Sequence, residues 1–247
     1  MVRGLDSVIR AVVFDLDDTL ISEREYVRSG FGAVGDVLAR RYDFESSALA
    51  EELNALFDAG EKQVFNRLLE RHHVDYEPRD IDELVAIYRR HEPNVTPFGD
   101  AIICGRALKA RGINIGIITD GYVDSQAAKM RVVEPLIPVD CVILTETLGR
   151  GYWKPHPRAF EEMANHFDIS IREIMYIGDN PAKDFLIGST HGVTTVRISR
   201  PGGVYSGTPY LEGVKEHHSI ESLAEVTDLV DAANRQTSWT LSPDDWP

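Results

Sequence analysis

Three carboxylates follow an apolar segment near the N-terminus. Residues 8–16 are mostly hydrophobic, and Asp15, Asp17 and Asp18 fall within four positions at the end of this segment. Burying such charges without partners costs several kcal/mol or more, so a purely structural role is disfavoured unless a cation lies beside them. Carboxylates crowded at the end of an apolar strand therefore indicate a ligand site rather than a solvated acidic turn.

Polar residues also follow three later apolar segments. Thr119 and Asp120 end one segment, Lys154 precedes a proline after the next, and Asp179 and Asp184 follow the fourth. A threonine hydroxyl and backbone N–H groups suit the oxygens of an anion, and a lysine ammonium neutralises a phosphate oxygen. Clustered carboxylates select Mg²⁺, which bridges to substrate phosphates. Each short motif alone is typical of a surface turn, so the prediction depends on their order and common location.

The elements that must position these residues alternate along the chain. Apolar, β-branched segments that predict buried parallel strands cover residues 8–16, 113–119, 139–145, 174–177 and 193–198. Helical patterns occupy residues 101–109, 157–167, 181–189 and 218–232, the last with Ser219 as a candidate cap. This alternation predicts an α/β fold with a doubly wound, mostly parallel, Rossmann-like sheet. Ligands bind outside the carboxyl ends of the strands in such sheets, where the polar residues fall.

One interval departs from the alternation. Between the first strand and residue 101, four helical patterns cover residues 26–41, 46–59, 61–72 and 80–91. Because a crossover between parallel strands normally needs one helix, we predict an inserted all-helical domain over residues 22–93. The alternative is that these helices simply cover one face of the sheet. The core would then comprise residues 1–21 and 94–234, and the polar residues 235–247 are predicted to form a disordered tail.

Composition limits the partners and the compartment. The chain has 247 residues and a formal net charge of -14, which argues against nucleic acid and anionic membranes as partners. The first residues lack the apolar region of a signal peptide and no segment is long enough to span a membrane, so a cytoplasmic location is predicted. Cys104 and Cys141 lie in apolar segments and are predicted to be small core residues rather than disulfide partners or zinc ligands.

Taken together, the motifs resemble those of the haloacid dehalogenase-like (HAD) hydrolase superfamily. They occur in order as Asp15-x-Asp17-x-Thr19, Thr119, Lys154-Pro155 and Gly178-Asp179-x-x-x-x-Asp184. The resemblance covers about residues 8–198, and the four helical patterns look like the helical cap that some members insert between the first two motifs.

The resemblance implies a phosphatase mechanism with assigned residues. Asp15 would attack phosphorus and form an aspartyl phosphate, while Asp17 would protonate the leaving oxygen and then deprotonate water. Mg²⁺ would be held by Asp15, Asp179 and Asp184, and by Asp17 through its backbone carbonyl, because a metal bound to its carboxylate would oppose the protonation that an acid needs.

The remaining positions follow in the same way. Thr19, Thr119, Asp120 and Lys154 would bind the substrate, and Asp18 is interpreted as a turn residue. Members that resemble dehalogenases or phosphonatases lack the second aspartate, so the resemblance favours hydrolysis of a small-molecule phosphate ester, of the nucleotide or sugar phosphate class. A phosphomutase or phosphotransferase and a catalytically silent binding module are the alternatives. The cap arginines and the loop at 200–203 have no predicted role.

Overall fold

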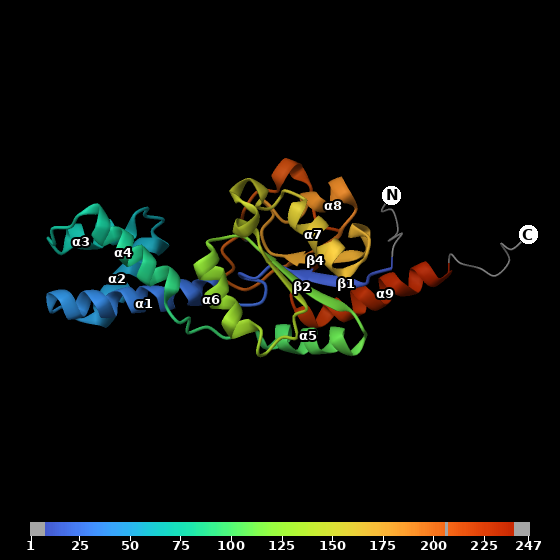
Figure 1. Cartoon of the computed structure of the whole chain (residues 1–247), viewed down its shortest axis with the longest axis horizontal. Coiled ribbons are helices and arrows are strands. Elements are labelled where there is room, and N and C mark those ends of the chain that lie inside the picture. Colours follow the sequence, from blue (N-terminus) through green and yellow to red (C-terminus); the bar gives the residue numbers. More distant parts are fainter. Residues whose placement is uncertain (1–7, 206, 240–247) are drawn as a thin grey trace, which may run out of the picture. The chain divides into compact units, whose positions relative to one another are not determined.

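A six-stranded parallel sheet organises the chain. The computed structural model describes residues 8–205 and 207–239 (Figure 1). The strands are β1 (Ala11–Phe14), β2 (Asn114–Thr119), β3 (Cys141–Leu144), β4 (Ile174–Gly178), β5 (Thr194–Ile198) and β6 (His218–Ile220). Their order is β3-β2-β1-β4-β5-β6, and every neighbouring pair is parallel. The predicted doubly wound sheet is confirmed, and the order reverses direction beside β1, where such sheets bind ligands.

Helices cover both faces of this sheet. They are α5 (Gly99–Ala110), α7 (Arg158–Phe167), α8 (Leu186–His191) and α9 (Val226–Trp239). Helices α5 and α9 lie on one side of the sheet and α7 and α8 on the other (Figure 1). Strands β1, β2, β4 and β5 are therefore almost entirely buried on both faces, which explains their continuous apolar segments, whereas the edge strands β3 and β6 are partly exposed.

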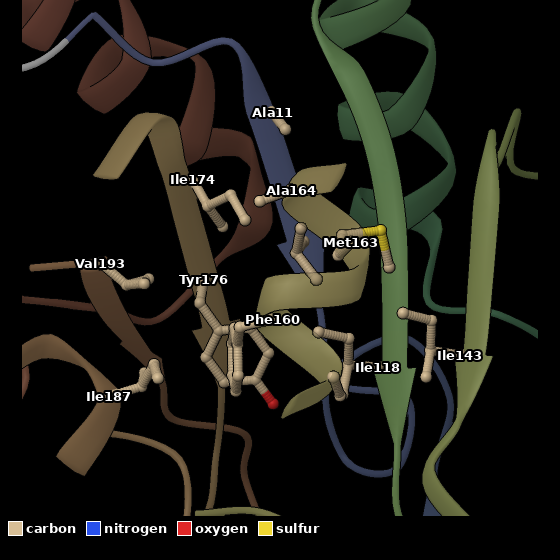
Figure 2. Close-up of a cluster of buried hydrophobic side chains, with 12 residues drawn as sticks. Ala11, Ile118, Ile143, Phe160, Met163, Ala164, Ile174, Tyr176, Ile187 and Val193 are labelled. Atoms are coloured by element: carbon tan, nitrogen blue, oxygen red, sulfur yellow. The ribbon is translucent and has the colours of Figure 1, made fainter. Parts of the chain in front are cut away.

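The core beneath α7 illustrates the packing. Phe160 and Met163 of α7 point onto strand residues such as Ile118 and Tyr176, and all four are buried (Figure 2). A Cβ atom at Gly116 of β2 would lie 2.6 Å from the sulfur of Met163, so glycine allows α7 to approach the sheet this closely.

The chain divides into two compact units. One comprises residues 1–22, 96–123 and 133–247 and contains the sheet; the other comprises Glu23–Val95 and Asp124–Val132. The second unit holds α1 (Glu23–Tyr42), α2 (Ser46–Asp58), α3 (Val64–Arg71) and α4 (Pro78–Arg90), with most of α6 (Val123–Val133). Its own core is formed by apolar side chains of α1 to α4, including Phe31, Leu53 and Leu68.

Residues 124–132 of α6 group with the helical unit, whereas the domains predicted from sequence place them in the core. Lys129 of α6 lies 4.2 Å above the ring of Tyr26 in α1, and the Arg90 side chain of α4 bonds to Asp124 at 2.7 Å. A cation over an aromatic face and an ion pair both favour this association. Nothing in the apolar spacing of the helix distinguishes its partners.

Three expectations about the chain are corrected. The predicted helix over 218–232 is wrong at its start, because His218–Ile220 form strand β6 and Ser222, not Ser219, begins the helical turn with a capping box to Glu225. The predicted helix over 181–189 begins only at Leu186. Residues 235–239 belong to α9 rather than to a disordered tail, and 240–247 lie outside the described residues.

The two cysteines are free thiols in or beside the core. Cys104 is buried, and burial raises the pKa of its thiol to about 12, as befits a core residue. Cys141 is half-buried, and both thiols are free. Among the described residues, no helix combines the length and apolar character needed to cross a bilayer.

The helical unit contains a buried histidine that predicts acid sensitivity. His91 is 8% exposed, and its Nδ1 bonds to the Tyr88 carbonyl at 2.6 Å. Burial, reinforced by the nearby Lys129 charge, lowers the His91 pKa below 6.5. The His91 imidazole therefore binds a proton more readily in the unfolded chain than in the folded one. The neutral imidazole contributes fully to the free energy of unfolding above about pH 6.5, and this contribution is lost as the pH falls through the folded-state pKa.

We expect the melting temperature to fall between pH 7.5 and 5.5, and to fall less in a His91→Phe variant, which keeps an aromatic ring without the titration. Thermal unfolding followed by circular dichroism measures both slopes. His73→Asn, at an exposed histidine of the same unit, serves as the control and should retain the wild-type slope. An unchanged slope in His91→Phe would contradict this assignment.

Candidate active site

Three acidic side chains converge at the carboxyl edge of the sheet. Asp15 follows β1, and Asp179 follows β4, the neighbouring strand; the Asp15 N–H donates to the Ile177 carbonyl at 2.8 Å. Asp184 reaches the same point from the turn before α8. One carboxylate oxygen from each of Asp15, Asp179 and Asp184 lies within 4.8 Å of the others, and all three residues are buried. Residues far apart in sequence therefore form one candidate cation site.

Lys154 is the positive centre of this cluster. Its ammonium donates to Asp15 Oδ1 at 2.7 Å and lies 3.0 Å from Asp184 Oδ1, and its side chain is 0% exposed. Burial alone would lower the Lys154 pKa, but the charges of Asp15, Asp184 and Asp120 raise it far above its usual value. The lysine is therefore a permanent cation, as recognition of an anionic group requires.

The same contacts set the charge of Asp15. Burial by itself would raise the pKa of this carboxyl, but the Lys154 and Lys183 charges and the Lys154 hydrogen bond lower it below 3.8. Asp15 is thus ionised at neutral pH although it is only 3% exposed. A buried, ionised carboxylate at a strand end has the properties of a nucleophile.

The pKa of Asp179 is raised, in contrast to that of Asp15, and this difference is relevant to metal binding. Burial, followed by repulsion from Asp15, Asp184 and Asp18, raises the Asp179 pKa to about 9. Without a further cation, the three carboxylates cannot all ionise. Buried oxygen ligands held close together and lacking sufficient positive charge fit a hard divalent cation such as Mg²⁺.

Asp184 is held rigidly by its surroundings. Its Oδ1 accepts from the Tyr176 hydroxyl at 3.1 Å, and its Oδ2 accepts from the Asn180 N–H at 2.9 Å. A Cβ atom at Gly178 would lie 2.5 Å from Asp184 Oδ2. Glycine at that position is therefore required for the carboxylate to pack against the end of β4.

Asp120 and Thr119 stand at the end of β2, beside β1. The Asp120 carboxylate accepts from the Thr145 hydroxyl at 2.7 Å and from the Lys154 N–H at 3.2 Å, and it lies 3.4 Å from the Lys183 ammonium. Its side chain thus joins the ends of β2 and β3 to the loop that carries Lys154. Thr119 is buried, and its carbonyl accepts from the same Thr145 hydroxyl at 3.1 Å.

The loop after β1 carries the other first-motif residues. Asp17 is half-buried, whereas Thr19 is fully buried and its hydroxyl has no hydrogen-bond partner among the described residues. Asp18, interpreted from sequence as a turn residue, has a left-handed backbone with φ 51°. A cavity beside Asp179 is lined by residues from the end of β5 and the loop that follows: Arg197, Ile198, Ser199, Arg200 and Gly203.

Sequence reasoning did not identify Tyr176 and Lys183 as site residues. The Tyr176 hydroxyl accepts from Lys154 at 2.7 Å and donates to Asp184, which ties the cation to the acid. A tyrosine within an otherwise apolar strand was the available signal, because a buried tyrosine hydroxyl normally finds a polar partner. Lys183 lies inside the fourth motif, and nearby carboxylates raise its pKa to about 12 against the effects of burial and Lys154.

Comparison with known proteins agrees with this geometry. The family model for haloacid dehalogenase-like hydrolases matches residues 12–198. The chain belongs to this family. It is therefore a hydrolase of the HAD type, as the motifs predict, and the matched residues run from the second residue of β1 to the end of β5 and include every site residue predicted from sequence.

Individual relatives extend the similarity over most of the chain. A glyceraldehyde 3-phosphate phosphatase of Methanocaldococcus jannaschii is 27% identical over 241 residues, covering 90% of this chain and 97% of the relative. The pyrophosphatase PpaX of Bacillus mycoides is 21% identical over 231 residues, covering 92% and 99%. The structure of the HAD-hydrolase YfnB of Bacillus subtilis, bound to magnesium, superposes with a TM-score of 0.63 at 20% identity, covering 91% of this chain and 100% of that one.

Proposed function

We propose that this HAD hydrolase is a Mg²⁺-dependent phosphatase that acts on a small phosphorylated metabolite through an aspartyl-phosphate intermediate. The observation that carries the proposal is the ionised Asp15 carboxylate, held 2.7 Å from the buried Lys154 ammonium and next to Asp179 and Asp184. The named phosphatase and pyrophosphatase relatives support phosphate as the group that is transferred.

In the proposed reaction, the chain's residues divide the chemistry. Asp15 attacks phosphorus, the bond to the ester oxygen breaks, and Asp17 gives that oxygen a proton, so that an alcohol leaves. Water then attacks the phosphorus of the aspartyl phosphate and gives a proton to Asp17, which releases inorganic phosphate and restores the carboxylate of Asp15. Lys154 and Thr119 bind phosphoryl oxygens and stabilise the charge that develops on them.

The carboxylates of Asp15, Asp179 and Asp184 would hold Mg²⁺, with the backbone carbonyl of Asp17. When bound, Mg²⁺ reduces the repulsion between the carboxylate nucleophile and the anionic substrate. The residues fit this ion because they offer oxygen ligands whose burial, together with their mutual repulsion, raises the Asp179 pKa to about 9. The all-helical unit would serve as the cap that selects the leaving group, and Thr19 and Asp120 would border the phosphoryl site.

We expect the purified protein to release inorganic phosphate from phosphate esters only when Mg²⁺ is present. A panel of sugar phosphates, nucleotides and pyrophosphate, each assayed with Mg²⁺ and with EDTA, measures this and identifies the substrate class. Because a ligand that binds only the folded state stabilises it, Mg²⁺ should also raise the melting temperature. Absence of phosphate release from every ester would contradict the proposed function, and transfer of phosphate to a second hydroxyl would replace hydrolysis with a mutase reaction.

A further inference from the structure

The loop that follows β5 is bonded to the loop that carries Asp17. Arg200 donates through Nη2 to the Thr19 carbonyl at 2.9 Å, and the Val204 N–H donates to Asp18 Oδ2 at 3.1 Å. Arg200 and Thr19 are 181 residues apart in sequence, and Val204 and Asp18 are 186 apart. The two successive residues after Asp17 are thus both bonded to the segment 200–204.

Arg200 is itself firmly anchored. Its guanidinium makes two hydrogen bonds to the Asp100 carboxylate, at 2.8 and 3.0 Å, and lies 4.1 Å above the Phe98 ring. Asp100 also accepts from the Ser222 hydroxyl at 3.0 Å and the Leu223 N–H at 2.9 Å. The Arg200 side chain is only 11% exposed, so its guanidinium is held in one position and fixes the position of the Thr19 carbonyl to which it donates.

The loop at 17–20 needs such support because it lies outside the strands. Asp15 is held by the continuation of β1 pairing and by Lys154, whereas Asp17 lies beyond β1, where it forms an isolated bridge to Ile21. Asp18 then adopts a left-handed φ of 51°, a conformation that costs free energy outside glycine and persists only when its surroundings enforce it. Beyond it, the Leu20 carbonyl accepts from the Phe98 N–H at 2.9 Å.

From these contacts we propose that Arg200 and Asp18 are positioning residues for Asp17. Their hydrogen bonds join the loop at 200–204 to the two residues that follow Asp17, so the role that we assign to them is to set the path of the backbone immediately after the acid–base residue. The inference rests on the proposed function, and it assigns a role to the loop at 200–203 and to the middle acid of the first motif. The segment 200–204 thereby becomes part of the catalytic support although it contains no catalytic residue.

This role predicts a characteristic kinetic pattern. A displaced Asp17 transfers its proton less effectively, and the loss matters most for leaving groups that need protonation. Phenyl phosphate and p-nitrophenyl phosphate have nearly the same shape, but p-nitrophenolate leaves far more readily without a proton. A defect in positioning Asp17 must therefore slow phenyl phosphate more, whereas a general loss of folded enzyme slows both equally.

The test is to compare kcat/KM on these two esters for the wild-type protein and for Arg200→Lys, because kcat/KM reports the steps up to departure of the leaving group and excludes the later hydrolysis of the aspartyl phosphate, which both esters share. A lysine ammonium is a single point charge and cannot reproduce the fork that joins Asp100 to Thr19. We expect kcat/KM to fall about tenfold or more on phenyl phosphate but about threefold or less on p-nitrophenyl phosphate, and the larger loss is a fraction of the whole general-acid effect of about 10²–10⁴. Asp17→Asn gives the limiting case with the same pattern.

Matched variants separate positioning from stability. Arg197→Lys is the control, because Arg197 lies in β5 and lines the same cavity as Arg200 but donates to the Tyr210 hydroxyl and the Tyr205 carbonyl rather than to the loop after Asp17. The ratio of its kcat/KM values on the two esters should equal that of the wild type. Asp18→Asn keeps an acceptor for the Val204 N–H and tolerates a left-handed backbone, so it should retain the wild-type ratio. Asp18→Gly keeps the backbone freedom but loses the acceptor and should reproduce the Arg200→Lys pattern.

Equal losses on both esters in Arg200→Lys, or an unchanged rate in it, would overturn the positioning role. If Arg200→Lys does not fold, the Asp18→Asn and Asp18→Gly pair decides, and equal ratios in the two would overturn it as well. Failure of the wild-type protein to hydrolyse any phosphate ester with Mg²⁺ would instead contradict the proposed function, so the two failures are distinguishable.

Discussion

An Asp15→Asn variant is expected to lose turnover by at least about 10⁴-fold, the scale seen when a covalent catalytic group is removed from an enzyme. The amide keeps the size of the side chain and can accept the hydrogen bond that Lys154 now donates to Asp15 at 2.7 Å. It has no negative charge and no nucleophilic oxygen comparable to the carboxylate. The Lys154 ammonium keeps Asp184 as a partner at 3.0 Å and one of three mutually repelling carboxylates is removed, so the fold should keep most of its stability.

Steady-state phosphate release and thermal unfolding measure the two sides of this prediction. Asp231→Asn is the matched control, since Asp231 pairs with Arg111 at 3.3 Å and is 38% exposed. It should retain the wild-type rate. An acid-quenched sample of the wild-type protein should carry one phosphoryl group on the peptide that contains Asp15. Turnover by Asp15→Asn at the wild-type rate would exclude Asp15 as the nucleophile.

The part of the site that can be predicted from sequence is the part carried by strand ends. The segment before Asp15 is continuously apolar because β1 is buried on both faces, and the same holds for β2 and β4. Since parallel strands place their carboxyl ends at one edge, charged residues that follow them must meet there. Asp15, Asp179 and Asp184 converge for this reason.

The parts that cannot be predicted depend on contacts without a local pattern. Strand β6 has three residues, which is too short for an alternation to be recognised. The bonds from Arg200 to Thr19 and from Val204 to Asp18 join distant loops, and arginine and aspartate are also common in solvated turns. The association of α6 with α1 depends on which neighbours its side chains meet, and amphipathic spacing does not specify them.

The site also shows why a strongly acidic chain can bind a phosphate. The net charge of -14 belongs to the whole sequence, but a substrate responds to the charges in its immediate surroundings. Around Asp15, the positive charges come from the buried Lys154 and the half-buried Lys183. The carboxylates in the same cluster are those of Asp15, Asp120, Asp179 and Asp184. A divalent cation would bring this local balance close to neutrality, so a cation and the phosphate are expected to favour each other's binding.

A Lys154→Met variant tests that balance, and we expect it to lose both activity and stability. Methionine fills much of the same volume but leaves Asp15 and Asp184 without the ammonium that lies 2.7 and 3.0 Å from them. Removing one partner of a buried ion pair costs about 3–5 kcal/mol of unfolding free energy. Loss of a preorganised charge on a phosphoryl oxygen should lower kcat by about 10²–10³-fold.

The two losses should respond differently to Mg²⁺, because the cation replaces the missing positive charge among the carboxylates but not the contact with the phosphoryl oxygen. We therefore expect Mg²⁺ to raise the melting temperature of Lys154→Met by more than it raises that of the wild-type protein, while kcat stays low. Lys109→Met is the matched control: Lys109 pairs with Asp140 at 2.7 Å but is 38% exposed, so its loss should change stability little. Wild-type activity in Lys154→Met would mean that the ammonium, although buried against Asp15, does not act on the substrate, and restoration of both properties by Mg²⁺ would reduce its role to charge balance alone.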